Sequence, residues 1–209
     1  MQMKKILITA GPTWVAIDPV RIISNISSGQ TGALLANKAR KLDFAVTLFL
    51  GPVLDSFELD RKIKVVRFTY FDELKDKLTR ILNDEKFDII IHAAAISDYE
   101  PIEKQRHKIP SNLDYLNLKL QKTPKLIPLI RKLAEKSFFV MFKLEDKVNS
   151  YYIDKTKKIM LSFCVNLAVL NSLNPYRARI IDRFKVSPLL KTKEELVESL
   201  FGLIKGLIK

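Results

Sequence analysis

The stretch from residue 9 to residue 32 holds the residues of this sequence that are best suited to chemistry. It reads TAGPTWVAIDPVRIISNISSGQTG, and its small, polar and turn-forming residues are Asp18, Pro19, Arg21, Ser24, Asn25, Ser27, Ser28, Gly29 and Gly32. A helix-like pattern follows at once, so these residues stand at the beginning of a helix. Unpaired N–H groups and the positive end of the helix dipole favour an anion there. The pattern therefore predicts a site for a phosphate or another anion.

The length of this connection also points to function. An apolar run from Lys4 to Gly11 predicts a strand, and Ala33 to Leu42 predicts a helix, with residues 27–29 as candidates for its cap. Connections between a strand and a helix usually have about two to six residues, and longer ordered ones are usually functional. The connection here is several times longer, so we expect it to carry part of a site.

The rest of the chain predicts an α/β fold, a Rossmann-like, mostly parallel sheet flanked by helices. Strand-like runs at 45–50, 64–68, 87–95, 138–144, 167–170 and 179–184 alternate with helix-like segments at 71–83, 125–136, 147–161 and 193–208. Thr192 is placed to cap the last helix. Residues 96–124 lack a helical period, which predicts a β-hairpin or flap insertion around residues 100–122, with 116–120 as its alternating strand. We expect one domain over residues 1–209.

Ligands of open α/β sheets bind beyond the carboxyl ends of the strands. In this sequence that rule selects residues 11–29, 95–124 and 142–147.

Composition narrows the function classes. The 209 residues are 47% hydrophobic, which supplies a full core, and no apolar run is long enough to cross a bilayer. With no signal peptide and a single cysteine, we expect a cytoplasmic protein without an internal disulfide, and Cys164 is interpreted as buried and inert. His92 is interpreted as a core residue and His107 as exposed, so no zinc or other metal cluster is expected.

The formal charge of +13 invites a nucleic-acid interpretation. The lysines are scattered over nearly every predicted helix, however, whereas a nucleic-acid footprint is a clustered stripe. Solvated helix faces explain most of the charge, and a nucleotide or a phosphorylated metabolite fits the remainder equally well.

The motifs of the three segments resemble those of the phosphopantothenate–cysteine ligase family, over nearly the whole chain. The series TAGPT, then IDPVR, then SNISSG with Gly32 resembles the family's opening signature. HAAAISDY at 92–99 resembles its alanine-rich strand end, and Lys108-Ile109 resembles the start of its lysine motif. KTPKL at 122–126 is similar to a family turn, and FKLE at 142–145 to the family's Phe-x-x-Glu element.

The resemblance implies a ligase of coenzyme A biosynthesis. The carboxylate of 4′-phosphopantothenate would attack the α-phosphate of CTP, or of ATP, with Mg²⁺, releasing pyrophosphate and leaving an acyl-nucleotidylate. The amine of L-cysteine would then displace the nucleoside monophosphate. The family's flavin-dependent decarboxylase domain is not expected here, so FMN is not expected either. A homodimer is implied, with the hairpin reaching toward the partner subunit.

The same resemblance assigns roles by position. Asn25 would hold the substrate carboxylate and then the acyl intermediate, and Lys108 would help to form that intermediate. The expected phosphate and substrate contacts are Arg21, Ser27, Ser28 and Gly29. The expected nucleotide contacts are Ala95, Asp98, Thr123, Pro124, Lys125, Leu126, Phe142, Lys155 and Lys157. The chain departs from the family at Pro110-Ser111, where further lysines often stand.

An NAD(P)-dependent reductase of the short-chain dehydrogenase kind is the alternative. Tyr151 and Lys155 have the Tyr-x-x-x-Lys spacing of that class and share one helix face. Against it, Gly11-Pro12-Thr13 replaces the glycine-rich fingerprint after the first strand, and Gly51-Pro52 ends the second strand without an acidic residue. A non-enzymatic nucleic-acid binder comes third, with only the charge in its favour.

Overall fold

The computed structural model describes residues 3–54 and 56–207. Its main sheet has the order β11-β10-β9-β6-β1-β4-β5, and all neighbouring strands are parallel except β11, which is antiparallel to β10. These strands are β1 (Lys5–Ala10), β4 (Ala45–Leu50), β5 (Lys64–Arg67), β6 (Ile89–His92), β9 (Phe138–Leu144), β10 (Leu167–Leu173) and β11 (Tyr176–Ile181). The predicted Rossmann-like α/β class is confirmed.

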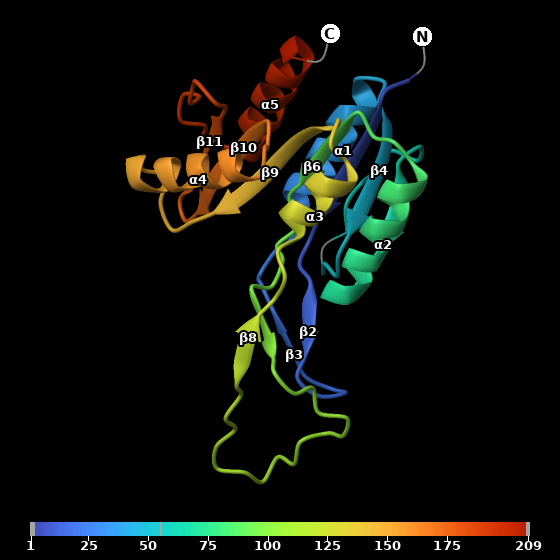
Figure 1. Ribbon diagram of the computed structural model, residues 1–209, viewed down its shortest axis with the longest axis vertical. Helices are drawn as coiled ribbons and strands as arrows, with labels where there is room; N and C mark the ends of the chain where they lie inside the picture. Colours follow the sequence, from blue (N-terminus) through green and yellow to red (C-terminus); the bar gives the residue numbers. More distant parts are fainter. Residues whose placement is uncertain (1–2, 55, 208–209) are drawn as a thin grey trace.

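Helices cover both faces of this sheet (Figure 1). One face carries α1 (Gln30–Lys41) and α5 (Lys193–Leu207), and the other carries α2 (Phe71–Asp84), α3 (Leu126–Leu133) and α4 (Ser150–Ser162). Because side chains alternate along a strand, Ile6 and Ile8 of β1 enter the core under α1 and α5, and Leu7 enters the core under α2 and α3. Both cores are therefore continuous across the parallel strands, as the unbroken apolar runs predicted.

Two small sheets extend from the carboxyl edge of the main sheet, at the end opposite the chain termini (Figure 1). In one, β2 (Trp14–Ala16) pairs with β3 (Ile22–Ser24), both within the long connection after β1. In the other, β7 (Tyr99–Pro101) pairs with β8 (Leu120–Lys122). We call residues 99–122 the flap. The predicted insertion around residues 100–122 is thus confirmed.

Some predicted element bounds were wrong. The flap strand lies at 120–122 rather than at 116–120, because Leu116 and Leu118 remain 47% and 36% exposed, without a surface to bury their apolar face. The last strand lies at 176–181 rather than at 179–184, because the Asp182 carboxylate accepts hydrogen bonds from the N–H groups of Phe184 and Lys185 and forms a turn there. Residue 208, the predicted end of the last helix, lies outside the described residues.

The interpretation of Cys164 as buried was also wrong. This residue is exposed, and its φ of 51° places it in the left-handed region just after α4. Its N–H donates to the carbonyl of Leu161, so it belongs to the turn that ends the helix rather than to the following strand. The cap predicted for α5 is confirmed, since Thr192 Oγ1 accepts from the N–H of Glu195 at 3.1 Å.

Gly32 sets how closely α1 approaches β1. A Cβ atom at this position would lie 2.1 Å from the Cβ of Ala10, far inside van der Waals contact. The third glycine of the dinucleotide-binding fingerprint permits the same close packing of helix on strand. Gly32 therefore brings the beginning of α1 against the end of β1.

We expect Gly32→Ala to lower the free energy of unfolding by about 1–3 kcal/mol, because a methyl group must be forced between two packed backbones. Gly202→Ala in α5 is the matched control, since nothing lies within 4 Å of the place that its Cβ would take. That control should raise stability by about 0.4–1 kcal/mol. Urea unfolding of the three proteins measures both effects, and equal midpoints for Gly32→Ala and wild type would contradict the packing argument.

Candidate functional site

The site lies where the strand order of the main sheet reverses. β1 stands between β4 and β6, so the crossovers on its two sides leave in opposite directions. In open α/β sheets ligands bind in the crevice at this point, beyond the carboxyl ends of the strands. The chain segments leaving β1 and β6 stay paired beyond the strands. The N–H of Thr13 donates to the carbonyl of Ala95 at 3.3 Å, and the N–H of Ala95 donates to the carbonyl of Gly11 at 2.9 Å. Two of the three predicted segments, 11–29 and 95–124, therefore meet at this point.

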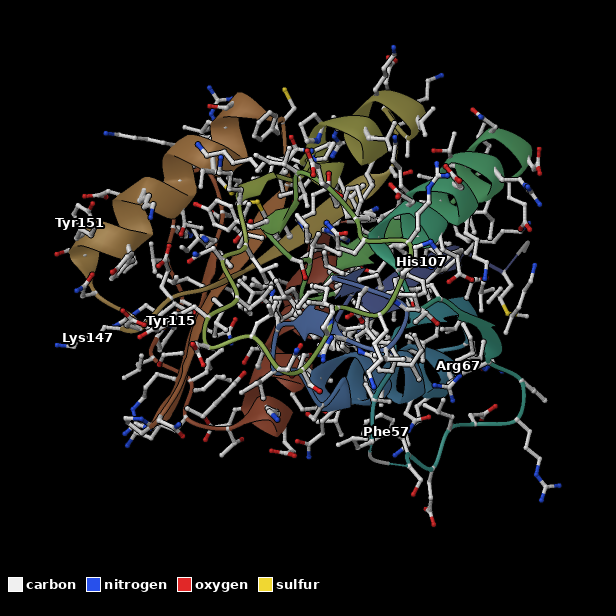
Figure 2. All side chains as sticks on the ribbon, turned by 90° about the horizontal axis from the view of Figure 1, so that it is seen from below. Phe57, Arg67, His107, Tyr115, Lys147 and Tyr151 are labelled. Atoms are coloured by element: carbon white, nitrogen blue, oxygen red, sulfur yellow. The ribbon has the colours of Figure 1, made fainter. Side chains whose placement is uncertain are left out.

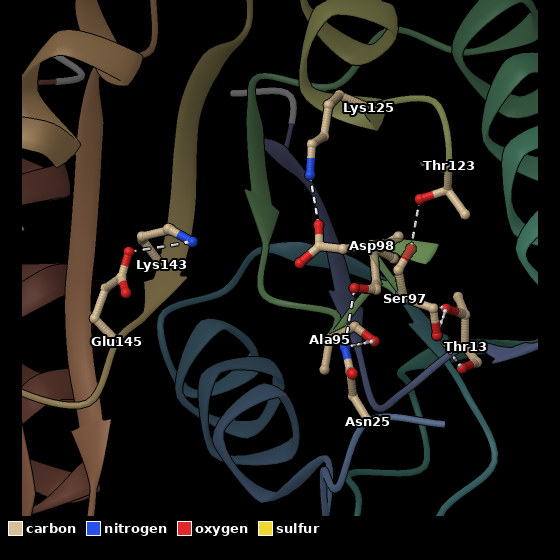
Figure 3. A network of polar contacts seen from close by, with 10 residues as sticks. Thr13, Asn25, Ala95, Ser97, Asp98, Thr123, Lys125, Lys143 and Glu145 are labelled. Atoms are coloured by element: carbon tan, nitrogen blue, oxygen red, sulfur yellow. Dashed lines mark hydrogen bonds and ion pairs between the residues drawn. The ribbon is translucent and has the colours of Figure 1, made fainter. Parts of the chain in front are cut away.

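Three buried hydroxyl side chains hold these segments together (Figure 3). Thr13 Oγ1 accepts from the N–H of Ser97 at 3.0 Å, and Ser97 Oγ donates to the carbonyl of Thr13 at 3.1 Å. Thr123 Oγ1 donates to the carbonyl of Ser97 at 2.5 Å, and the N–H of Thr123 donates to the carbonyl of Asp98. Satisfied buried hydrogen bonds of this kind fix a local geometry. The end of β8 is thereby tied to the loop after β6.

Asn25 is docked on the same loop. Its Nδ2 donates to the carbonyl of Ile96 at 2.9 Å and lies 3.5 Å from the carbonyl of Ala95 (Figure 3). The residue remains exposed. The structure thus brings together two residues that the sequence placed in one site, Asn25 and Ala95, although they are 70 positions apart. The side-chain amide stands at the solvent side of the crevice.

The beginning of α1 has no side-chain cap at its cap residue. Gly29 occupies the cap position with a φ of 74°, makes no side-chain cap, and no acidic residue follows in the first turn. Ser28 Oγ accepts from the N–H of Gln30 at a long 3.4 Å, and Ser27 is half-buried beside it. An uncapped helix beginning without acidic residues is electrostatically suited to an anion. Ser27, Ser28 and Gly29 therefore lie where an anion-binding role requires them.

Asp98 and Lys125 form an ion pair between the loop after β6 and the turn before α3 (Figure 3). Both side chains are about 60% exposed, so the pair contributes little to stability and can be exchanged for a ligand. Pro124 is exposed, whereas Leu126 is buried in the core with Ile130. Leu126 can therefore contact a ligand only through its backbone.

Two lysines meet one carboxylate at the end of β9. Glu145 lies 3.4 Å from Lys143 Nζ and 3.2 Å from Lys155 Nζ, which comes from α4. The hydrogen bond to Glu145 raises the pKa of Lys155. Phe142, on the same strand, is half-buried against the core. Figure 3 shows Lys143 and Glu145 together at the end of β9, in one view with Asp98 and Lys125.

Lys157 is not brought to this group. Residues two apart on a helix are separated by about 200° around its axis. Since Lys155 points to Glu145, Lys157 faces away from the end of β9. The rotation of α4 thus favours Lys155 over Lys157 at this group, and the nucleotide contact of Lys157 stays a prediction.

Lys108 is exposed on the flap, which extends beyond the carboxyl edge of the sheet (Figure 1; neighbouring His107 is labelled in Figure 2). The residue after it, Ile109, is hydrogen-bonded to Asp18 and Arg21 of the long connection. Burial raises the pKa of the Asp18 carboxyl group, but hydrogen bonds from the N–H groups of Val20, Ile109 and Arg21 and from the Arg21 guanidinium outweigh it and lower the pKa to about 2. Asp18 is therefore a carboxylate at neutral pH.

Three residues of this region were given no role from the sequence: Asp18, Ser97 and Lys143. A usable signal existed for Asp18, because the carboxylate of an aspartate in a turn typically accepts from backbone N–H groups a few residues further on, here those of Val20 and Arg21. Ser97 and Lys143 carry no such signal, because their contacts are made with residues distant in sequence or across a strand end.

The reductase alternative finds no support in α4. Lys155, the lysine of the Tyr-x-x-x-Lys spacing, is paired with Glu145, and its ammonium lies over the ring of Tyr152 at 5.5 Å rather than beside Tyr151. Tyr151 is 68% exposed. None of the described helices combines the length and the apolar character needed to cross a bilayer.

His92, at the end of β6, gives a pH-dependent prediction. It is buried, its Nδ1 lies 2.8 Å from Thr9 Oγ1, and burial lowers its pKa to about 4. This confirms the interpretation as a core residue.

Because the unfolded chain binds a proton at His92 near pH 6.5 and the folded chain does so only near pH 4, the free energy of unfolding should fall as the pH drops through this window. The expected slope from this residue is about 1.4 kcal/mol per pH unit. Urea unfolding at several pH values should show a shallower slope for His92→Gln than for wild type. His107→Gln, at the exposed histidine, is the control, and identical slopes for His92→Gln and wild type would contradict the assignment.

Comparison with known proteins identifies relatives of the whole chain. Residues 1–196 match the family model "DNA/pantothenate metabolism flavoprotein C-terminal domain". The chain is 36% identical over 171 residues to the coenzyme A biosynthesis bifunctional protein CoaBC of Vibrio vulnificus, covering 79% of this chain and 42% of that protein. It thus spans about half the length, or less, of the curated relatives it matches.

Solved structures share the fold. The DNA/pantothenate metabolism flavoprotein of Streptococcus pneumoniae superimposes with a TM-score of 0.87 at 26% identity, over 98% of this chain and 99% of that chain. A Cab2 variant in complex with phosphopantothenate-cysteine superimposes with a TM-score of 0.77 at 16% identity, over 96% of this chain and 86% of that chain. At this identity the second likeness shows the fold alone.

Proposed function

This chain belongs to the family of DNA/pantothenate metabolism flavoprotein C-terminal domains, and from that premise we propose that it is a ligase joining 4′-phosphopantothenate to L-cysteine. The observation that carries the proposal is the meeting of the two signature segments in one crevice, where the Asn25 amide rests on the carbonyl of Ile96. The names of two relatives support it. The Vibrio vulnificus protein acts in coenzyme A biosynthesis, and the Cab2 variant was solved with phosphopantothenate-cysteine, the product of such a ligation.

The reaction needs two steps. A carboxylate is a poor electrophile, so its oxygen first attacks the α-phosphate of a nucleoside triphosphate, and the bond to pyrophosphate breaks. The cysteine amine then attacks the acyl carbon of the acyl-nucleotidylate, the nucleoside monophosphate leaves, and the amine loses a proton. The site must therefore hold two anionic substrates together and neutralise the charge on the transferring phosphorus.

The residues of the crevice can be assigned to these two substrates. We assign the phosphate of phosphopantothenate to Ser27, Ser28 and Gly29 at the beginning of α1. Arg21, whose guanidinium binds Asp18 and the Ile109 carbonyl, is assigned as a further substrate contact. Asn25 holds the substrate carboxylate and then the acyl group. The assigned nucleotide contacts are Ala95, Asp98, Thr123, Pro124, Lys125, the backbone of Leu126, Phe142 and Lys155. Lys143, held by the same carboxylate as Lys155, joins this set.

CTP or ATP enters as the co-substrate together with Mg²⁺. The described residues hold no group of three or more His, Cys, Asp or Glu side chains that could bind a metal ion by themselves. Mg²⁺ usually keeps several waters and is bound by one or two carboxylates plus substrate phosphates. Asp98, an exposed carboxylate on the nucleotide side, would hold such an ion, which would neutralise phosphate charge. The reaction is not a redox reaction, and the proposal includes no FMN.

We also propose a cytoplasmic homodimer formed through the flap and the long connection. These segments expose large apolar side chains to an extent that is unfavourable in a monomer. Ile26 is 96% exposed, Tyr115 is 85% exposed, and Leu113 and Ile102 are each 54% exposed. Exposed apolar patches of this kind mark protein–protein contacts. Light scattering at micromolar concentration should give twice the mass of the chain, and a monomer would contradict this part of the proposal.

Pyrophosphate release tests the function directly. The purified protein is mixed with 4′-phosphopantothenate, Mg²⁺ and each nucleoside triphosphate in turn, with and without L-cysteine. We expect one stoichiometric burst of pyrophosphate without cysteine and continuous release with it. Absence of pyrophosphate with every nucleotide would overturn the proposed function, and NADPH oxidation instead would favour the reductase alternative.

A further inference from the structure

One arm of the flap is fastened to the long connection at two points. The N–H of Gln105 donates to the carbonyl of Ile17 at 3.1 Å, and the N–H of Ile109 donates to Asp18 Oδ2 at 3.1 Å. Lys108 lies between these two anchors and is itself exposed. The position of its backbone is therefore set by the residues that hold Ile109.

Asp18 and Arg21 hold the Ile109 peptide groups from both sides. While Asp18 Oδ2 accepts from the Ile109 N–H, Arg21 Nη1 donates to the Ile109 carbonyl at 3.1 Å and also to Asp18 Oδ2. The other carboxylate oxygen, Oδ1, accepts from the N–H groups of Val20 and Arg21, both at 2.8 Å, and closes a local turn. The two carboxylate oxygens of Asp18 therefore have different roles. Oδ1 stabilises the turn of its own loop, and Oδ2 binds the flap 91 residues away.

A fully buried carboxylate is costly unless its lone pairs are satisfied. The side chain of Asp18 is 0% exposed, and it accepts four hydrogen bonds. Only an ionised carboxylate, which has no proton of its own to place, can accept all four of these hydrogen bonds at once. They hold the Asp18 side chain in one position, away from solvent. The flap lysine is held by this cluster, although none of these four hydrogen bonds reaches the crevice residues Asn25 or Asp98.

We propose that Asp18 is a positioning residue for Lys108: through Ile109 it fixes the backbone of the flap lysine, to which the proposed function gives a role in acyl-nucleotidylate formation. The inference rests on the proposed function. Asp18 touches neither substrate nor nucleotide in this role, and it acts on the first step only through the lysine. A misplacement of about 1 Å at a reacting group can cost about 100-fold in rate.

Asp18→Asn isolates the flap side of the cluster. The asparagine Oδ1 can still accept from the N–H groups of Val20 and Arg21 and keep the local turn. Its Nδ2 would then face the Ile109 N–H and the Arg21 guanidinium, which are both donors. We expect hydrogen exchange at the Ile109 amide to become at least about tenfold faster, and pyrophosphate formation in a single turnover to slow by about 10- to 100-fold.

A double-mutant cycle separates positioning from a general structural role. Asp18→Asn should slow pyrophosphate formation in the wild-type background but cause no further decrease in a Lys108→Ala background. A merely structural role would slow both backgrounds alike. Should Asp18→Asn fail to fold, Ile109→Pro is run through the same cycle, because proline removes the N–H group that donates to Asp18 Oδ2 and leaves the assigned substrate contacts unchanged.

The outcomes are distinguishable. Non-additive rates together with faster exchange at Ile109 support the positioning role. Equal effects in both backgrounds, an unchanged rate, or an Ile109 amide that exchanges freely in the wild-type protein overturn it while leaving the ligase proposal intact. Absence of pyrophosphate formation by the wild-type protein overturns the ligase proposal, and the role of Lys108 with it.

Discussion

Replacing Lys108 by alanine is expected to slow pyrophosphate formation by about 100- to 1,000-fold, the usual cost of removing one group that neutralises charge in a transition state. The physical reason is the charge that builds on the α-phosphate as the substrate carboxylate attacks. Lys108 is exposed on the flap and its backbone is anchored on both sides, so the lysine enters the reaction with little further loss of backbone entropy. Quenched-flow measurement of pyrophosphate, without cysteine, reports this step alone.

Lys119→Ala is the matched control for this prediction. Lys119 lies on the opposite arm of the flap, is also exposed, and its carbonyl accepts from the N–H of Ile102, a contact that the substitution leaves in place. The control removes the same charge from the same insertion, and it should leave the rate within about twofold, as for a surface substitution. If both variants lost activity equally, the net charge of the flap would explain the result and the specific role of Lys108 would be wrong.

The fold could be predicted from the sequence where burial is periodic. Ile89, Ile90 and Ile91 form an unbroken apolar run, and the structure buries all three between two layers of helices. The flap could be predicted as an insertion but not in its strand pairing. Leu116 and Leu118 alternate as a strand would, yet they stay 47% and 36% exposed, and alternation alone does not make a strand.

For the site, the sequence allowed us to predict which chain segments form it but not the contacts between their residues. The rule that ligands bind beyond the carboxyl ends of strands selected the right loops, because β1 and β6 are neighbours in the sheet. It could not predict that Asp18 would bond to Ile109, because such a contact depends on how the flap folds back over 91 residues. Nor could spacing alone decide between Lys155 and Lys157, since that choice depends on the rotation of α4 against β10.

Replacing Asn25 by alanine is expected to separate the two steps of the reaction. Pyrophosphate should still form, because the charge of the attacking carboxylate and the triphosphate is met by lysines and not by a neutral amide. The amide product should fall by about 100-fold or more, because the acyl-nucleotidylate is no longer held for attack by the cysteine amine. Chromatography of single-turnover mixtures, which resolves pyrophosphate, the intermediate and the product, measures all three.

Asn25→Asp sharpens this test. Aspartate has nearly the shape of asparagine but offers no N–H to the carbonyls of Ile96 and Ala95, and its charge repels both the carboxylate substrate and the carbonyl oxygens. It should therefore impair pyrophosphate formation as well, whereas alanine should not. Since Asn25 is exposed, neither change should lower the free energy of unfolding by more than about 1 kcal/mol. An unaltered amide yield from Asn25→Ala would show that holding the acyl intermediate is the task of another group, and the contact with Ile96 would then be structural only.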